Sequence, residues 1–170
     1  MRSEQINIFI IDDDKILSHA LKNEINNHFE DQKVNVRTFE AGELCEPFLK
    51  IKPDIAIVDY HLNSKFKDAK NGVEIIEMIK KQSPDTEVIL FTKDDNLGLA
   101  VEAFQNGANE YVVKNDYMFR RLNVAILQCL KYRELKLELK WKKERRVIAM
   151  VLIGVLLSVA IACQILAKKL

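Results

Sequence analysis

Five polar residues stand at or just after the ends of short apolar runs in the sequence, namely Asp12, Asp13, Asp59, Thr92 and Lys114. Three carboxylates that lie close together repel one another unless a cation lies among them. Ligation by oxygen atoms alone favours Mg²⁺, which keeps several of its waters. A metal site with a nucleophilic carboxylate, a hydroxyl and an ammonium group beside it is suited to phosphoryl transfer.

The apolar runs that precede these residues alternate with segments of helical periodicity. Strands are predicted over runs rich in Ile and Val, at Ile6–Ile11, Val34–Phe39, Ile55–Val58, Val88–Thr92 and Tyr111–Val113. Helices are predicted between them, at Lys15–Phe29, Ala41–Lys50, Gly72–Gln82 and Leu97–Asn106, and a last helix begins near Asp116. This alternation is typical of an α/β fold with a doubly wound, five-stranded parallel sheet that helices cover on both faces.

In a doubly wound sheet the ligand site lies outside the carboxyl ends of the strands, where the strand order reverses. The five polar residues follow four such ends, so we expect them to lie on one edge of the sheet. Asp59 is then the candidate nucleophile, and a Mg²⁺ ion with Lys114 would neutralise charge on the phosphoryl oxygens. The hydroxyl of Thr92 would donate a hydrogen bond to the same group.

The motifs around these residues resemble those of the receiver domain of two-component response regulators, which has a CheY-like, flavodoxin-like fold. The matching segments are "IIDDD" for the acidic pair, "IVDYHL" for Asp59, "ILFTK" for Thr92 and "YVVK" for Lys114. The run "AFQNGANEYVVK" is similar to the family's segment that leads into the last strand, with Tyr111 three positions before Lys114. The resemblance covers about residues 5–130.

The resemblance implies that Asp59 accepts a phosphoryl group from a histidine kinase or a phosphotransfer protein. It implies a Mg²⁺ site with four ligands, which are the side chains of Asp12, Asp13 and Asp59 and the backbone carbonyl of His61. It also implies that Thr92 and Lys114 bind the phosphoryl group. Thr92 and Tyr111 would then act as a switch that changes a protein-binding face, so we expect a signalling protein and not an enzyme.

Each of these residues also has a plainer interpretation. Asp13 or Asp14 could cap the first helix, because carboxylates are common N-caps. Thr92 could be an ordinary strand residue, Lys114 a solvated charge and Tyr111 a core aromatic.

The sequence departs from the family pattern in the segments around the site. Gly72 lies 13 residues beyond Asp59, where the family has a Gly about eight residues beyond, and the added segment carries Lys65, Lys67 and Lys70. Lys93 follows Thr92 where the family has a small residue, and Asn115 follows Lys114 where the family has Pro. Lys93 is therefore a possible modulator of phosphorylation. Asp14, which follows the acidic pair, is a second possible modulator.

Two other functions remain open from the sequence. A receiver-like fold that no longer takes phosphate would be a membrane-bound adaptor, which Lys93 and the long segment after Asp59 favour. A phosphatase of the haloacid dehalogenase type also uses an Asp nucleophile with Mg²⁺, and "IIDDDK" fits its D-x-D motif through Asp12 and Asp14.

Charge is unevenly distributed along the chain. Residues 1–130 hold 16 Lys and Arg against 22 Asp and Glu, whereas residues 131–146 hold 8 against 3. A nucleic-acid binder carries its basic patch on the folded domain, so we expect no nucleic acid as a partner. Cys45, Cys129 and Cys163 lie far apart without metal-ligand spacing, which is typical of a reducing compartment.

The chain is predicted to comprise a receiver domain at 1–130, a basic helical linker at 131–146, a transmembrane helix at 147–167 and a polar tail at 168–170. The 21 residues of 147–167 carry no charge. As a helix they span about 31 Å, the thickness of a bilayer's hydrocarbon core. The alternative for this segment is a buried core helix.

The flanks of this segment predict its orientation in a lipid bilayer. Six Lys and Arg residues lie between Lys136 and Arg146, and two follow the segment. This asymmetry predicts a single-pass protein of the cell membrane with the N-terminal domain in the cytoplasm. Gly154, Ser158 and Ala162 recur every fourth residue, a spacing that lets helices pack closely and makes a homodimer possible.

Overall fold

In the computed structural model of the chain, residues 5–62 and 70–167 are described, except for the side chains at 157, 159–163 and 165–167. Two of the lysines in the long segment after Asp59, Lys65 and Lys67, lie outside the described residues, as does the tail at 168–170. The chain separates into two units, Met1–Leu130 and Lys131–Leu170.

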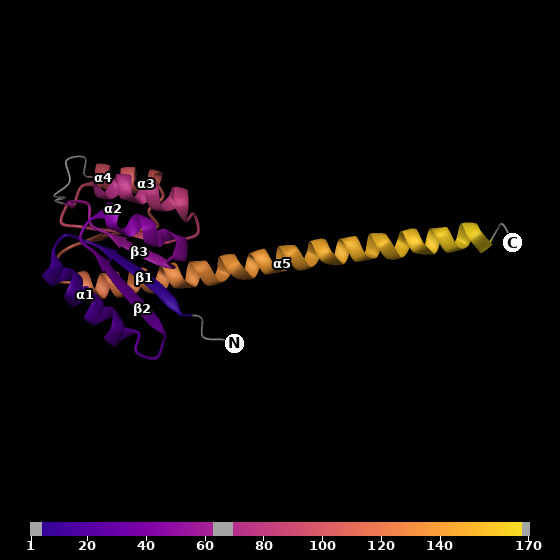
Figure 1. Cartoon of the computed structure of the whole chain (residues 1–170), viewed down its shortest axis with the longest axis horizontal. Helices are drawn as coiled ribbons and strands as arrows, with labels where there is room; N and C mark the ends of the chain where they lie inside the picture. Colours follow the sequence, from indigo (N-terminus) through magenta and orange to yellow (C-terminus); the bar gives the residue numbers. More distant parts are fainter. Residues whose placement is uncertain (1–4, 63–69, 168–170) are drawn as a thin grey trace. The chain divides into compact units, whose positions relative to one another are not determined.

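The first unit is built on a parallel sheet of five strands (Figure 1). The strands are β1 (Ile6–Ile11), β2 (Val34–Phe39), β3 (Ile55–Val58), β4 (Glu87–Thr92) and β5 (Glu110–Val113), in the spatial order β2-β1-β3-β4-β5. Each neighbouring pair is parallel, and the register places Ile11 beside both Phe39 and Val58. The reversal of strand order lies at β1 and β3, and this confirms the predicted doubly wound, flavodoxin-like sheet.

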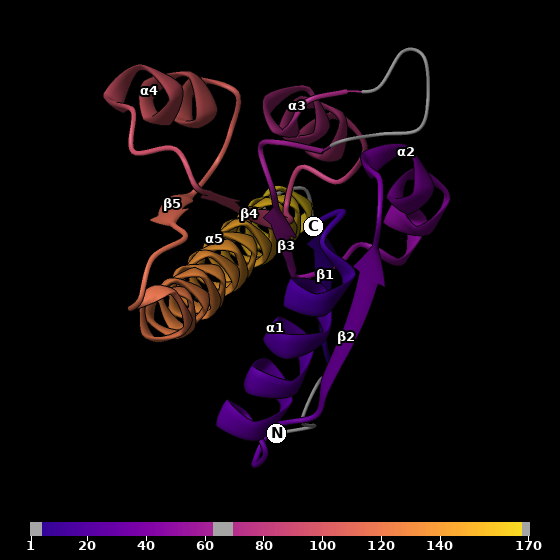
Figure 2. The same cartoon turned by 90° about the vertical axis from the view of Figure 1, so that its left-hand side faces the viewer.

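The helices of the first unit lie on both faces of this sheet. They are α1 (Lys15–His28), α2 (Gly42–Cys45) with the 3₁₀ helix η1 (Glu46–Ile51), α3 (Gly72–Gln82), α4 (Leu97–Gln105) and the start of α5 (Met118–Ala167). Figure 2 shows α2, α3 and α4 on one side of the strands and α1 with α5 on the other.

The predicted single helix over Ala41–Lys50 is divided in the structure. An α-helical turn ends at Cys45 and a 3₁₀ helix begins at Glu46, with Pro47 in its first turn. Proline has no N–H to donate to a carbonyl four residues earlier, so the α-helical hydrogen bonds cannot continue through it. Strands β4 and β5 each begin one residue earlier than predicted, at Glu87 and Glu110, because backbone pairing continues past the apolar residues.

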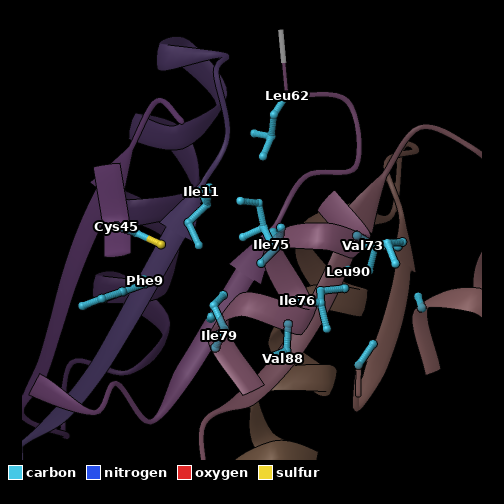
Figure 3. Close-up of a cluster of buried hydrophobic side chains, with 14 of the residues drawn as sticks. Phe9, Ile11, Cys45, Leu62, Val73, Ile75, Ile76, Ile79, Val88 and Leu90 are labelled. Atoms are coloured by element: carbon cyan, nitrogen blue, oxygen red, sulfur yellow. The ribbon is translucent and has the colours of Figure 1, made fainter. Parts of the chain in front are cut away.

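Two apolar cores follow from the alternation of side chains along the strands. In β1, Phe9 and Ile11 face the core under α2, α3 and α4, shown in Figure 3, whereas Ile8 and Ile10 face the core under α1 and α5. All four residues of β3 are at most 1% exposed, so this central strand is buried on both faces. A strand held between two cores gives the residue that follows it, Asp59, a rigid support.

Gly72 begins α3 against the backbone of the residue that follows β3. A Cβ atom at Gly72 would overlap the carbonyl oxygen of Asp59 and the Cα atom of Tyr60, and the Gly72 amide donates to the Tyr60 carbonyl at 3.0 Å. Asn71 completes a capping box with Glu74, each side chain accepting from the other's backbone N–H. The long segment after Asp59 therefore ends on a firmly anchored helix start beside Asp59.

The second unit consists of the helical residues of α5 that follow Leu130. Its large apolar side chains between Val147 and Leu156 are more than half exposed. Within the part of the chain whose residues are described, no helix combines the length and apolarity needed to cross a membrane. The predicted transmembrane segment at 147–167 therefore gains no support from the described residues, and several of its side chains are not among those described.

The contact of Gly72 with Asp59 predicts that Gly72→Ala destabilises the first unit by about 1–3 kcal/mol, the cost of forcing a group into filled space. Thermal or urea unfolding measures this loss. Gly98→Ala is the control, because a Cβ atom there would meet only the side chain of Asn96, at 3.2 Å. Equal unfolding midpoints for the two variants would contradict the tight approach of α3 to Asp59.

Candidate functional site

Backbone hydrogen bonds of the sheet extend past the strand ends and fix the residues that follow them. The Asp12 amide donates to the Phe39 carbonyl at 3.0 Å, and the Asp59 amide donates to the Ile11 carbonyl at 2.8 Å. The Lys114 amide donates to the Thr92 carbonyl at 2.7 Å. Backbone pairing alone therefore brings these residues to the carboxyl edge of the sheet.

The ammonium group of Lys114 lies between two of the predicted carboxylates. Its Nζ atom is 2.9 Å from Asp12 Oδ2 and 2.8 Å from Asp59 Oδ2. The three side chains are 5%, 2% and 9% exposed, respectively, so these ion pairs are shielded from solvent. Lys114 is thus a buried counter-ion and not the solvated charge that its sequence position also allowed.

Asp13 joins Asp12 and Asp59 in a cluster of carboxylates. One oxygen from each of the three lies within 4.8 Å of the others, and Asp13 is the partly exposed member. Three carboxylates and one ammonium group leave a net charge of two negative units when all are ionised. A small divalent cation with oxygen ligands, such as Mg²⁺, matches both the charge and the donor type.

Burial raises the pKa of the Asp12 carboxyl above its ordinary value of 3.8. The hydrogen bond and charge of Lys114 oppose this shift, as does the Asp14 amide, which donates to Asp12 Oδ1 at 2.9 Å, while the charge of Asp59 adds to it. The net direction means that ionised Asp12 is less stable in the folded chain than in water. A further positive charge nearby would stabilise the ionised form of this carboxylate.

Asp14 is the N-cap of the first helix, a role that the sequence allowed for either Asp13 or Asp14. Its Oδ1 atom accepts from the Leu17 amide at 3.0 Å at the start of α1. This contact turns the Asp14 side chain to the helix, so of the three consecutive acids Asp12 and Asp13 belong to the carboxylate cluster. A direct effect of Asp14 on phosphorylation stays a prediction.

Thr92 and Tyr111 are linked through the backbone of Asp94. Thr92 is fully buried, and its Oγ1 atom accepts from the Asp94 amide at 3.3 Å. The Tyr111 hydroxyl donates to the Asp94 carbonyl at 2.8 Å. Burial, with the charges of Asp94 and Asp95, raises the pKa of Tyr111, which keeps the hydroxyl protonated as a donor.

His61 and Lys93 lie in the loops that follow β3 and β4. The His61 side chain is exposed, with Nε2 2.7 Å from Asp94 Oδ2, while the role of its carbonyl as a metal ligand stays a prediction. Lys93 is exposed directly after Thr92. Asn115, where the family has Pro, accepts from the Tyr117 amide at 3.0 Å before α5.

Asp94 is the residue of this site that the sequence interpretation missed. The available signal was its place two residues after Thr92, mirroring the place of His61 two residues after Asp59. Acids are common in such loops, so the spacing alone did not distinguish Asp94 from its neighbour Asp95.

A family model described as the response regulator receiver domain matches residues 8–126 of the chain. Among curated proteins, the heme response regulator HssR of Staphylococcus epidermidis is 34% identical over 110 residues, which are 64% of this chain and 45% of HssR. The DNA-binding transcriptional regulator NtrC of Proteus hauseri is 28% identical over 109 residues, which are 64% of this chain and 21% of NtrC. The chain therefore spans less than half the length of these two relatives.

Solved structures show the same fold. The BeF₃-activated receiver domain of DrrB is 27% identical, with a TM-score of 0.60, and the match covers 75% of this chain and 98% of that one. The response regulator DrrB of Thermotoga maritima is 26% identical, with a TM-score of 0.61, covering 75% of this chain and 54% of that one.

The raised pKa of Asp12 predicts that Asp12→Asn stabilises the metal-free protein at neutral pH and removes stabilisation by Mg²⁺. Because the folded chain binds the Asp12 proton more tightly, this residue's contribution to the free energy of unfolding rises as the pH falls from the raised pKa towards 3.8. The advantage of Asp12→Asn should shrink over the same range. Urea unfolding in EDTA and in Mg²⁺ at several pH values measures both effects.

Asp13→Asn is the matched control, since it removes the same charge from a partly exposed side chain of the same cluster. Its gain in the metal-free protein should be smaller, and its stabilisation by Mg²⁺ should also fall. If metal-free Asp12→Asn were less stable than the metal-free wild type, this would contradict the cost assigned to the buried charge of Asp12.

Proposed function

Because the chain belongs to the family of response regulator receiver domains, we propose that Asp59 accepts a phosphoryl group from a phosphohistidine. The donor would be a histidine kinase or a phosphotransfer protein of a two-component system. The observation that carries the proposal is the buried ion pair of Lys114 with Asp59, in a cluster whose remaining charge suits Mg²⁺. Such a site provides a nucleophile and positive charge for phosphoryl oxygens at one edge of the sheet.

In the proposed reaction a carboxylate oxygen of Asp59 attacks the phosphorus atom of the phosphoimidazole. The phosphorus–oxygen bond forms as the phosphorus–nitrogen bond breaks, and the imidazole nitrogen keeps the electron pair of that bond. Lys114, already 2.8 Å from Asp59 Oδ2, is placed to pair with a phosphoryl oxygen. Thr92 Oγ1 accepts from the Asp94 amide and still has its own hydrogen to donate.

The residues that would hold Mg²⁺ are Asp12, Asp13 and Asp59 through their carboxylates and His61 through its carbonyl. The ion would neutralise charge on the phosphoryl oxygens during transfer. The net negative charge of the cluster supports this role.

We propose that the output is a protein–protein contact and that the protein is not itself an enzyme. Movement of Thr92 towards a phosphoryl group would shift the Asp94 backbone, which is hydrogen-bonded to Thr92. The Tyr111 hydroxyl, at the edge of the sheet, is bonded to the same backbone and would shift with it. Beside Tyr111, helix α4 exposes an apolar stripe with the spacing of one helix face, formed by Leu97, Val101 and Phe104. A partner protein or a second copy of the chain would bind this face, and nucleic acid is not an expected partner.

We propose that residues 147–167 tether the protein to the lipid bilayer of the cell membrane, with the receiver domain in the cytoplasm. The support is the uncharged run of 21 residues behind the basic segment at 131–146. Tethering would confine the receiver domain near membrane-bound kinases and raise its local concentration there.

Incubation with acetyl phosphate and Mg²⁺ should add one phosphoryl group to the full chain and none to Asp59→Asn, as read by intact mass. Asp95→Asn is the control, because it removes an exposed acid from the nearby loop and should leave labelling unchanged. Loss of labelling in EDTA would support the metal site. An unlabelled wild type that still binds partners would favour the adaptor, and ester turnover that survives Asp59→Asn would favour the phosphatase.

Membrane tethering predicts that the full chain stays in the membrane pellet after alkaline carbonate washing of expressing cells. Ile153→Lys with Leu156→Lys should release it, because two charges at the centre of a span cost about 5–7 kcal/mol together. Ile153→Ala with Leu156→Ala is the matched control and should remain in the pellet. A wild-type chain that carbonate extracts completely would contradict the tether.

A further inference from the structure

A cavity of about 580 Å³ lies between α1 and α5, on the face of the sheet opposite α2, α3 and α4 (Figure 2). The lining of this α1–α5 groove includes Glu24 and His28 of α1 and Phe119, Val124 and Leu127 of α5. Cavities of about 300–1,000 Å³ with largely apolar walls are typical of small-molecule sites. The groove belongs to the first unit and shares no lining residue with the carboxylate cluster.

Asn123 brings a buried polar group to the lining of the α1–α5 groove. This residue is 5% exposed, and its Nδ2 atom donates to Glu24 Oε1 at 3.0 Å. Its Oδ1 atom is buried and accepts no hydrogen bond within the part of the chain that the structure describes. The opposite amide orientation would turn the oxygen towards the Glu24 carboxylate, so the observed one is favoured. A buried acceptor of this kind gains from a hydrogen-bond donor.

The charged residues of the α1–α5 groove favour a cation as that donor. Two carboxylates, of Glu24 and Asp116, and one guanidinium group, of Arg120, line it together with His28. With a neutral His28 these charges sum to one negative unit. The Glu24 carboxylate also lies next to the Asn123 amide, so two acceptors stand side by side. A single positive charge with two N–H groups would serve both acceptors and neutralise the groove.

We propose that the α1–α5 groove binds a small molecule that carries an amidinium or guanidinium group on a flat apolar body. One N–H of the group would donate to Asn123 Oδ1 and a second to the Glu24 carboxylate. The apolar body would pack against Phe119 and Leu127. The inference is independent of phosphorylation at Asp59.

Access to the Asn123 oxygen requires a neighbouring side chain to move, because the oxygen is covered. The lining includes side chains that are well exposed, with Tyr117 at 70% and Leu127 at 45%. Exposed side chains change rotamer on the picosecond to nanosecond timescale. Rotation of such a wall opens a path for a ligand of a few atoms' width.

The test is a titration of the ¹⁵N-labelled full chain, in detergent micelles at pH 8, with benzamidine as the probe. The side-chain amide signals of Asn123 should shift with a dissociation constant of about 0.1–5 mM, the range for a fragment of this size. Benzamide has the same shape without the charge and should bind at least about tenfold more weakly. Thermal unfolding should shift upward with benzamidine concentration in the wild type.

Three variants, followed by the backbone signals of α1 and α5, assign the binding to this groove. Asn123→Leu removes the acceptor at similar side-chain size and should weaken benzamidine binding about tenfold. Glu24→Gln keeps an oxygen for the Asn123 amide, removes the charge and should weaken binding to a similar extent. Gln128→Leu is the matched control, because Gln128 lines a separate cavity on the β5 side of α5 and should leave binding unchanged.

An absence of shifts at about 10 mM benzamidine would overturn the inference, because even a weak fragment site would then be largely occupied. Equal affinity of wild type and Asn123→Leu would overturn it as well, as would benzamide binding as tightly as benzamidine. A short peptide with one arginine between leucines tests a protein side chain as the source of the same group. Tighter binding of this peptide than of benzamidine would assign the groove to a protein partner and overturn the small-molecule site.

Discussion

The ammonium group of Lys114 lies against two carboxylates that the sheet holds away from solvent, and the geometry of the edge depends on this contact. Asp12 follows β1, Asp59 follows β3 and Lys114 follows β5, so three strands must be in register for the ion pairs to form. Loss of the Lys114 ammonium would leave both carboxylates buried without their shared cation, and such an uncompensated buried charge costs more than an ion pair contributes. The two cores on either face of β3 supply the rigidity that keeps these charged groups aligned.

The fold was largely predictable because its signals are local. Runs rich in Ile and Val marked the strands, and a strand such as Ile55–Val58 reads as continuous apolar sequence because it is buried on both faces. The division of the second helix at Pro47 was a local signal that the sequence interpretation overlooked. The first residues of β4 and β5 are glutamates, and their membership in the sheet depends on backbone pairing that side-chain polarity does not reveal.

The residues at the carboxylate cluster were predictable for a different reason. Parallel strands bring their carboxyl ends to one edge, so Asp12, Asp59 and Lys114 could be placed together without knowledge of any loop. Loop contacts were not predictable in this way. The bond between His61 and Asp94 and the approach of Gly72 to Asp59 depend on backbone paths between elements, for which the sequence carries only turn and cap signals.

The connection between β3 and α3 is anchored at both of its ends. Asp59 is fixed by the Ile11 carbonyl at one end, and Asn71 and Gly72 are fixed by the capping box and the Tyr60 carbonyl at the other. Loop-closure entropy grows only slowly with length, so peptides of different sizes can join two such anchors at little cost. This connection is therefore a suitable place to graft a foreign sequence, such as an epitope or a reporter tag, without displacing the acidic edge of the sheet.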